Sequence, residues 1–176
     1  MIIYFLRHAS AGDPAMSAAK DEKRPLDKLG VEQSHDIGAA LAGLKVEVDA
    51  IISSPLLRAM QTAEITAQEI GHKDKVQVEV ALRPEAGYDQ FQDLLNRHQR
   101  KPAIMLVGHN PSLTEFLNRL LSGEPGVNVL ELKKGALAKV ESDGSSAVLK
   151  WCVTPKFVRT LQRASASSSR PKTLSK

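Results

Sequence analysis

Two histidines and two arginines follow closely behind three short apolar segments of the chain. Arg7 and His8 come directly after the first segment, Arg58 follows the second, and His109 follows the third after a single glycine. A neutral imidazole is a competent nucleophile near physiological pH, and a guanidinium is a forked donor that matches the oxygens of a phosphate. Phosphoryl transfer needs mainly positioning and positive charge, so this set of side chains favours a phosphoryl site.

Each of these four residues alone could have a purely structural role. A histidine at a strand end is usually hydrogen-bonded within the fold, and an arginine on a helix usually reaches solvent. The combination is more informative, because open α/β sheets bind ligands just beyond the carboxyl ends of their strands. Four such residues behind three candidate strands therefore predict one shared site.

The residues after the second and third apolar segments have the composition of helix starts. Ser54 is suited to cap a helix and Pro55 to occupy its first position, which places Arg58 in the first turn. Asn110 and Pro111 repeat this pattern after the third segment. Because unpaired N–H groups and the helix dipole favour an anion at such a terminus, the pattern supports a phosphate site.

Short apolar runs alternate with longer amphipathic stretches as far as Leu121, as in repeated βα units. The expected strands, each buried on both faces, are Ile2–Leu6, Ala50–Ser53, Val76–Val80 and Ala103–Val107. The expected helices are Leu26–Leu44, Pro55–Ile70, Tyr88–Arg100 and Pro111–Leu121. The predicted fold class is therefore α/β, a three-layer sandwich in which a mostly parallel central sheet is flanked by helices.

A hairpin is expected nearer the end of the chain. Ala136–Val140 and Ala147–Val153 are β-rich segments, and the step from Asp143 to Gly144 between them is a hairpin turn signal. These segments predict an antiparallel pair of strands near the C-terminus.

The chain is expected to end in a short helix and a tail. The helix begins at Pro155 and continues to about Gln162. The residues beyond are Ser-rich and basic, and they have too few apolar side chains to order themselves. We therefore predict a single domain over residues 1–162 and a flexible tail over residues 163–176.

Composition excludes several classes of protein. Hydrophobic residues make up 42% and charged residues 25% of the 176-residue chain, as in ordinary soluble globular proteins. No segment approaches the roughly 20 apolar residues that span a bilayer, and Cys152 has no partner for an intrachain disulfide, so we expect a cytoplasmic protein without membrane association. The net charge of +4 favours anionic partners, but no nucleic-acid recognition motif accompanies it.

Three motifs resemble the signatures of the histidine phosphatase superfamily. They are the arginine-histidine pair in IYFLRHAS at 3–10, the Ser-Pro-x-x-Arg-Ala-x-x-Thr-Ala pattern in SSPLLRAMQTAEI at 53–65, and the Gly-His pair in LVGHNPSLTEFL at 106–117. Their order and spacing resemble the family over the first two thirds of the chain. Ala9 stands where the superfamily commonly has glycine, a departure that its SixA-like group accommodates.

The resemblance implies a phosphoglycerate mutase-like fold and a phosphatase that uses neither a metal nor another cofactor. In such an enzyme His8 would attack phosphorus in line and form a phosphohistidine intermediate. Arg7, Arg58 and His109 would hold the equatorial oxygens and stabilise the developing charge. Water would then release phosphate.

Three further residues are candidates for the site. Arg24, which precedes Pro25-Leu26, resembles an arginine that lines the phosphate pocket in the SixA-like group, although it could equally face solvent. Glu85 lies near the position of the acidic proton donor in many relatives, and Asp13 is a second candidate for that role. The SixA-like group often lacks this carboxylate, and Glu85 could be an exposed loop residue.

The compact chain most resembles the SixA-like phosphohistidine phosphatases, because it has little room for the insertions that build a lid in larger relatives. The implied substrate is phosphohistidine on a partner protein, such as a histidine phosphotransfer domain. One alternative is a phosphomonoesterase for a sugar, nucleotide or glycerate phosphate, which a functional acid at Glu85 would favour. Another is a noncatalytic module that binds phosphorylated proteins, which the presence of both His8 and His109 disfavours.

Other catalytic schemes lack their residues. His35, His72 and His98 show no metal-ligand spacing, so we predict no metal site and expect these histidines at the surface. The chain has no G-x-x-x-x-G-K-[ST] loop for a nucleotide. Cys152 is not followed by a phosphate-cradling loop and an arginine, so we expect it in the core.

Overall fold

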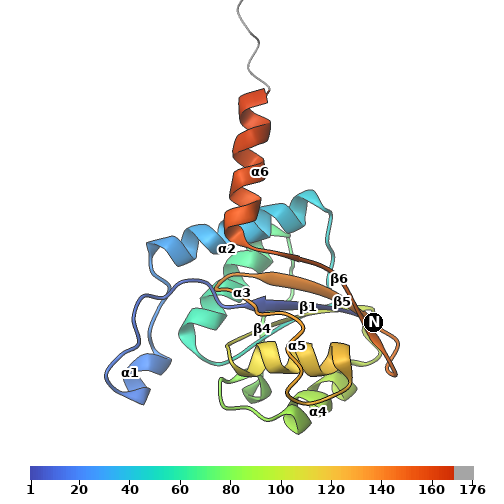
Figure 1. The fold of residues 1–176 in the computed structure, drawn as a ribbon. Helices are drawn as coiled ribbons and strands as arrows, with labels where there is room; N and C mark the ends of the chain where they lie inside the picture. The colour runs from blue at the N-terminus through green and yellow to red at the C-terminus, as the bar shows by residue number, and fades with distance from the viewer. Residues whose placement is uncertain (169–176) are drawn as a thin grey trace, which may run out of the picture.

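The computed structural model of the chain describes residues 1–168, and within them a mixed six-stranded sheet lies between helices (Figure 1). The strands are β1 (Ile2–Arg7), β2 (Ala50–Ser53), β3 (Gln77–Val78), β4 (Ala103–Gly108), β5 (Leu137–Ser142) and β6 (Ala147–Val153). The helices are α1 (Ala18–Glu22), α2 (Lys28–Gly43), α3 (Leu57–Glu69), the 3₁₀ helix η1 (Val80–Leu82), α4 (Tyr88–His98), α5 (Ser112–Ser122) and α6 (Pro155–Ser168).

The order of the strands is β3-β2-β4-β1-β5-β6. The first four of these are parallel to one another, and β5 runs antiparallel to both β1 and β6. The predicted α/β class, with a mostly parallel sheet and a C-terminal antiparallel pair, is confirmed. Gly144, with φ of 95°, makes the expected hairpin turn, and the Asp143 carboxylate accepts hydrogen bonds from the backbone of the turn.

Alternate side chains of the central strands supply two separate cores. From one face, Ile3 and Phe5 of β1 pack with Phe91 of α4 and Phe116 of α5. Tyr4 and Leu6 of β1 belong to a second cluster that also contains residues of α2, α3 and α6. Figure 1 shows these helix groups on opposite sides of the sheet. Burial on both faces explains why β1 and β4 are continuous apolar runs.

The segment predicted as the strand Val76–Val80 is different in the structure. Only Gln77 and Val78 pair with β2, at the edge of the sheet, and both are exposed. From Val80 the chain turns into η1, which buries Ala81 and Leu82. The apolar residues of this segment therefore enter the core through a turn, and the expectation of a strand buried on both faces is wrong.

The last helix is longer than expected. α6 begins at Pro155, as predicted, but continues to Ser168 and extends away from the body (Figure 1). Near its base, Arg159 forms an ion pair with Asp36 of α2 at 2.6 Å. The part of the predicted tail from residue 169 onward lies outside the described residues. Among those described, no helix is long and apolar enough to cross a membrane.

The loop after β1 lies directly against the start of α2. Asp27 caps α2 by accepting a hydrogen bond from the backbone N–H of Gly30, and its other carboxylate oxygen accepts one from the Ser10 hydroxyl at 2.7 Å. Gln33 accepts a hydrogen bond from the backbone N–H of Ser10. A Cβ at Gly30 would lie 1.9 Å from the Ser10 carbonyl oxygen, so only glycine permits this approach.

We predict that Gly30→Ala destabilises the protein, because the added methyl group forces the loop after β1 away from α2. The free energy of unfolding should fall by about 1–3 kcal/mol or more, as in overpacked sites, measured by urea denaturation. Gly43→Ala in the same helix is the control, since no atom lies within 4 Å of its added Cβ and glycine costs stability in a helix. Equal loss of stability in the two variants would contradict the prediction.

Candidate functional site

The parallel register of the sheet brings the three predicted site segments together. Arg7 at the end of β1 is paired with Gly108 at the end of β4, so His8 and His109 follow at the same edge. The backbone N–H of His8 donates to the Gly108 carbonyl at 2.9 Å. On the other side of β4, the N–H of Ser54 donates to the Val107 carbonyl at 2.9 Å. The ends of β1, β4 and β2 are thereby fixed side by side.

The two imidazoles are neighbours, with ring centroids 4.9 Å apart. His8 is 6% exposed and His109 is 1% exposed. Nδ1 of His8 lies 2.7 Å from the carbonyl oxygen of Ala9, and because a carbonyl only accepts, this nitrogen carries the ring proton. Nε2 of His8 then has a free lone pair, and no hydrogen bond from the described residues reaches it. The geometry therefore leaves the lone pair on Nε2 of His8 available for a bond to a ligand.

Ser54 orients the second imidazole. Its hydroxyl lies 2.8 Å from Nε2 of His109 and 3.4 Å from the backbone N–H of Leu56, which donates to it. We assign the hydroxyl proton to the bond with Nε2, which places the ring proton of His109 on Nδ1. That nitrogen is buried without a hydrogen-bond partner among the described residues. Nδ1 of His109 is therefore a donor that remains available to a ligand.

The expected helix caps in this region are wrong. α3 begins at Leu57 with Leu56 as its N-cap, and α5 begins at Ser112 with Pro111 as its N-cap. Ser54 bonds His109 instead of capping α3. Arg58, the second residue of α3, nevertheless lies in the first turn as predicted.

Arg7 and Arg58 are held in the same manner. Nη1 of Arg7 donates to the carbonyl of Leu132 at 2.8 Å, and Nη1 of Arg58 donates to the carbonyl of Asp21 at 2.8 Å. The Nε of each arginine is buried and has no partner among the described residues. Within residues 1–168, both guanidinium groups thus keep their Nε–Nη2 edge, the edge that binds two oxygens of an anion side by side, without a hydrogen-bond partner.

Burial and neighbouring cations keep both imidazoles neutral. Burial, opposed by the bond to Ala9 and assisted by the charges of Arg58 and Arg7, lowers the pKa of His8 to about 3. Burial likewise lowers the pKa of His109 to about 2, with contributions from His8 and the same arginines. A neutral nucleophile surrounded by cationic donors is suited to attack an anionic phosphoryl group.

Thr62 is a site residue that the sequence pattern did not single out. Its hydroxyl accepts a hydrogen bond from the backbone N–H of Ala9 at 3.1 Å and donates to the Arg58 carbonyl at 2.7 Å. It therefore ties the loop that carries His8 to the helix that carries Arg58. Thr62 is the threonine of the Ser-Pro-x-x-Arg-Ala-x-x-Thr-Ala pattern, and that motif is the sequence signal that could have identified it.

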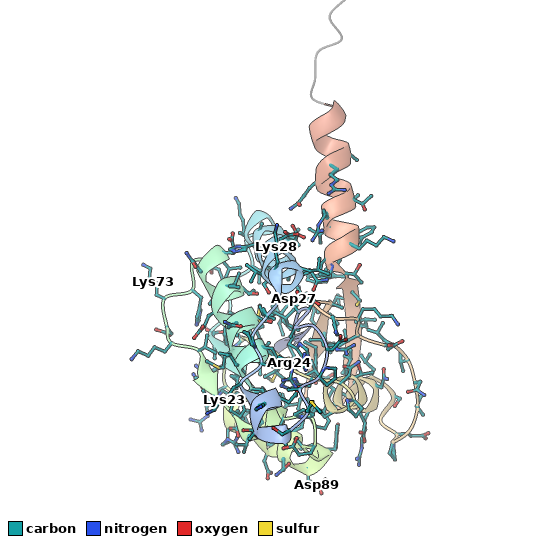
Figure 2. All side chains as sticks on the ribbon, turned by 90° about the vertical axis from the view of Figure 1, so that its left-hand side faces the viewer. Lys23, Arg24, Asp27, Lys28, Lys73 and Asp89 are labelled. Carbon is teal, nitrogen blue, oxygen red and sulfur yellow. The ribbon has the colours of Figure 1, made fainter. Side chains whose placement is uncertain are left out.

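Arg24 is part of the framework around the site. Its Nε donates to the Asp21 carboxylate at 2.7 Å, and its Nη1 donates to the carbonyls of Ala11 and Gly12 at 2.6 and 3.1 Å. In Figure 2, which views the side of the molecule that carries α1, Arg24 lies centrally, with Asp27 above it. These bonds leave only Nη2 of Arg24 for a substrate oxygen, so its contacts are mainly those of a brace.

The two candidate proton donors are placed differently from the four central residues. The Glu85 side chain is 65% exposed and accepts a hydrogen bond from Arg83 at 2.5 Å, which lowers the pKa of Glu85. A general acid at neutral pH needs a raised pKa, so this environment opposes the role. Asp13 is exposed in the loop after β1. The geometry gives neither carboxylate the features of a proton donor.

The other histidines and Cys152, which the sequence analysis considered as metal ligands or as a nucleophile, lie elsewhere in the fold. His35 is exposed and pairs with Glu69, whereas His72 and His98 are partly buried. Within residues 1–168 no group of three or more His, Cys, Asp or Glu side chains is arranged to hold a metal ion. Cys152 on β6 is partly buried against the core, and burial raises the pKa of its thiol.

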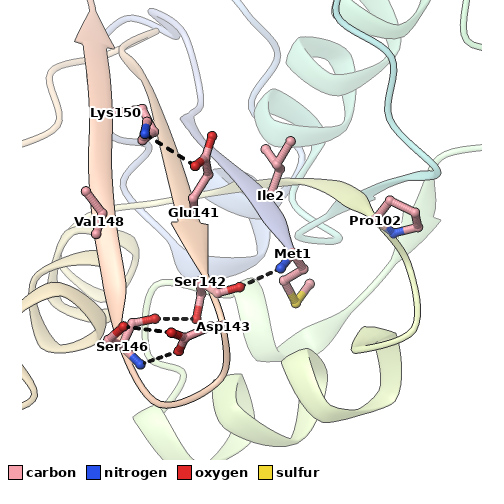
Figure 3. Close-up of a pocket in the computed structure, with 9 residues that line it drawn as sticks. All are labelled: Met1, Ile2, Pro102, Glu141, Ser142, Asp143, Ser146, Val148 and Lys150. Carbon is pink, nitrogen blue, oxygen red and sulfur yellow. Dashed lines mark hydrogen bonds and ion pairs between the residues drawn. The ribbon is translucent and has the colours of Figure 1, made fainter.

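A pocket of about 580 Å³ lies at the opposite end of β1 (Figure 3). Its lining includes Met1, Glu141 and Lys150, and the last two form an ion pair at 3.3 Å. Because Met1 and His8 stand at opposite ends of the strand, this pocket is separate from the imidazole pair.

The sequence profile of the Histidine phosphatase superfamily (branch 1) matches residues 3–95, more than half of the chain. The chain belongs to this superfamily. The matched span contains Arg7, His8 and Arg58, and His109 lies beyond it.

Relatives of this histidine phosphatase superfamily member match along most of its length. It is 37% identical to an uncharacterised protein of Picosynechococcus over 81% of the chain and 86% of that relative. It is 27% identical to the phosphohistidine phosphatase SixA of Escherichia coli over 88% of the chain and 94% of SixA. A structure of the protein histidine phosphatase SixA complexed with tungstate matches with a TM-score of 0.77 and 26% identity, over 89% of this chain and 98% of that one. The predicted SixA-like resemblance is confirmed.

We predict that stability falls as the pH drops below about 6.5, the ordinary pKa of histidine. Folded His8 and His109 bind a proton only near pH 3 and pH 2, so in between the unfolded chain binds more protons. Each imidazole should remove up to about 1.4 kcal/mol of unfolding free energy per pH unit. Urea denaturation between pH 7 and pH 4 in phosphate-free buffer should therefore show a shallower slope for His8→Asn than for wild type. Parallel profiles would contradict the assignment.

Proposed function

We propose that this chain is a metal-independent phosphatase that hydrolyses phosphohistidine on a partner protein through a covalent phospho-His8 intermediate. One observation carries the proposal. The His8 ring lies beside the His109 ring, and the charges of Arg7 and Arg58 lower the pKa of both imidazoles. Nε of Arg7, Nε of Arg58 and Nδ1 of His109 are buried donors without a partner among the described residues. Buried polar atoms without partners are rare in folded proteins, and three such donors together favour an oxyanion ligand.

In the first step, the lone pair on Nε2 of His8 attacks phosphorus in line with the leaving group. The bond between phosphorus and the leaving nitrogen breaks, and the electron pair departs with that nitrogen, which takes a proton from solvent. Nδ1 of His8 keeps its proton and its bond to the Ala9 carbonyl. That bond stabilises the charge which the ring acquires when Nε2 is phosphorylated.

In the second step, water attacks the phosphorus of phospho-His8. The bond from phosphorus to Nε2 breaks, the electron pair returns to the imidazole, and phosphate leaves. The Nε–Nη2 edges of Arg7 and Arg58 hold the equatorial oxygens throughout, and Nδ1 of His109 adds a neutral donor. Because these donors are already fixed by Leu132, Asp21 and Ser54, little reorganisation accompanies the transfer.

The choice of phosphohistidine rests on the leaving group and on the relatives. Oxygen leaving groups gain more from a proton donor than nitrogen leaving groups do, and neither Glu85 nor Asp13 is arranged as one. Similarity to SixA proteins along most of the chain supports the same substrate class. Metal independence is supported by the charge of the site, because the guanidinium groups of Arg7 and Arg58 beside the imidazoles repel a cation and attract an anion.

The covalent step predicts a labelled enzyme. A phosphohistidine-bearing protein labelled with ³²P should transfer label to wild-type enzyme, and the phosphoenzyme should be acid-labile and stable to alkali. His8→Ala should form none and should lose at least about 10³-fold in rate, as expected when a nucleophile is removed. His35→Ala is the matched control, because His35 is exposed and belongs to no part of the site. Equal labelling of wild type and His8→Ala would exclude the mechanism.

Substrate selectivity gives a separate prediction. With EDTA present, phosphate release from a phosphohistidine-bearing phosphotransfer domain should exceed that from sugar, nucleotide and glycerate phosphates in kcat/KM. Activity that disappears with EDTA and returns with a divalent cation would refute metal independence. His8-dependent activity mainly on small esters would replace the proposed substrate with a phosphomonoester. Binding of the phosphorylated domain without turnover would instead identify a noncatalytic binding module.

A further inference from the structure

Asp21, on the short helix α1, contacts both Arg58 and Arg24. Its carboxylate oxygen Oδ2 lies 3.2 Å from Nη1 of Arg58, and its backbone carbonyl accepts a hydrogen bond from the same Nη1 at 2.8 Å. The other carboxylate oxygen, Oδ1, accepts hydrogen bonds from Nε of Arg24 at 2.7 Å and from the backbone N–H of Ala15 at 3.0 Å. One residue therefore holds Arg58 at two points and is itself held at two others.

We propose that Asp21 is a positioning residue that presets Arg58 for the phosphoryl group, with Arg24 as the brace that fixes Asp21. This inference rests on the proposed function. Asp21 engages only the Nη1 end of the guanidinium, so the Nε–Nη2 edge has no hydrogen-bond partner in the described part of the chain. Asp21 thus selects which edge of Arg58 faces the substrate.

Electrostatics explains why an anion is needed at this point. Arg58 is 5% exposed, and burial together with the charge of Arg24 lowers the pKa of Arg58 while Asp21 raises it. The hydrogen bonds from Arg24 and from the Ala15 N–H lower the pKa of Asp21 to about 2, so Asp21 is ionised at any pH at which the enzyme would work. Removal of its charge would leave two guanidinium groups repelling each other beside a buried site.

The comparison with Arg7 shows what Asp21 adds. Among the described residues, Nη1 of Arg7 has one hydrogen-bond partner, the neutral carbonyl of Leu132. Nη1 of Arg58 has an equivalent carbonyl, that of Asp21, and a carboxylate in addition. The carboxylate is therefore the extra component, and its removal leaves the backbone bond to Arg58 in place.

α1 also offers a matched control. The neighbouring Glu22 forms an ion pair with Arg83 and has no contact with Arg58. No residue of α1 is buried, so neither Asp21 nor Glu22 contributes to the hydrophobic core. Asp21→Asn and Glu22→Gln each remove one charge of the same helix without a change of shape, and only the first weakens a contact to Arg58.

The experiment measures oxyanion affinity and catalysis separately on the full chain. Isothermal calorimetry with tungstate and with inorganic phosphate gives Kd, and phosphate release from the phosphorylated domain gives kcat and KM. We expect Asp21→Asn to weaken both oxyanions about tenfold and to lower kcat/KM by at least as much, because a misplaced donor loses contact with the phosphoryl oxygens. Asp21→Glu, which keeps the charge, should recover part of the affinity. Glu22→Gln should match wild type in both measurements.

Three outcomes would overturn the proposal. The first is an unchanged Kd for both oxyanions in Asp21→Asn, and the second is an equal loss in Asp21→Asn and Glu22→Gln. The third is a fall in affinity matched by a fall in Tm in Asp21→Asn that Asp21→Glu does not recover, which would indicate a structural role. Since oxyanion binding needs no turnover, weaker binding in Asp21→Asn supports the proposal even where no phosphohistidine is hydrolysed, so the two proposals fail separately.

Discussion

The site depends on the parallel pairing of β1 with β4. This ladder places Arg7 opposite Gly108 and ends in the hydrogen bond from the His8 N–H to the Gly108 carbonyl, so the two histidines emerge at one edge. The contacts of each histidine do not by themselves determine its position, because the register of the β1–β4 pairing determines where each strand ends. A shift of that register by one residue would turn the side chains of β1 to the opposite faces and misalign both cores.

The donors of the site are costly to the folded state. Nε of Arg7, Nε of Arg58 and Nδ1 of His109 are buried without partners among the described residues, and an unsatisfied buried donor costs about 1–3 kcal/mol. The structure tolerates this cost because each side chain is fixed at another atom, by Leu132, Asp21 and Ser54. Under the proposed function a phosphoryl group would supply the missing acceptors, and the donors would already be in place before it binds.

The sequence predicted the periodic parts of this structure well. Strands buried on both faces, such as Ala50–Ser53, could be predicted because a short continuous apolar run between turn signals is typical of them. Val76–Val80 was misassigned because the same apolar composition can belong to an edge strand or to a 3₁₀ turn. Ser54 was assigned to a cap for a similar reason, since its local sequence is that of a cap and its contact with His109 is 55 residues distant.

The convergence of the four central residues could be predicted because each lies at or soon after the end of a strand, whereas the position of Asp21 beside them could not. Asp21 lies on a five-residue helix with no buried side chain, so no periodicity marks it. Its importance arises from tertiary contacts with Arg24 and Arg58, which no local pattern encodes. In the proposed arrangement Asp21 neutralises Arg58 from the Nη1 side, and a phosphoryl group would approach the Nε–Nη2 edge. The two anions would not compete for the same nitrogen, so the charge of Asp21 need not be displaced for a substrate to bind.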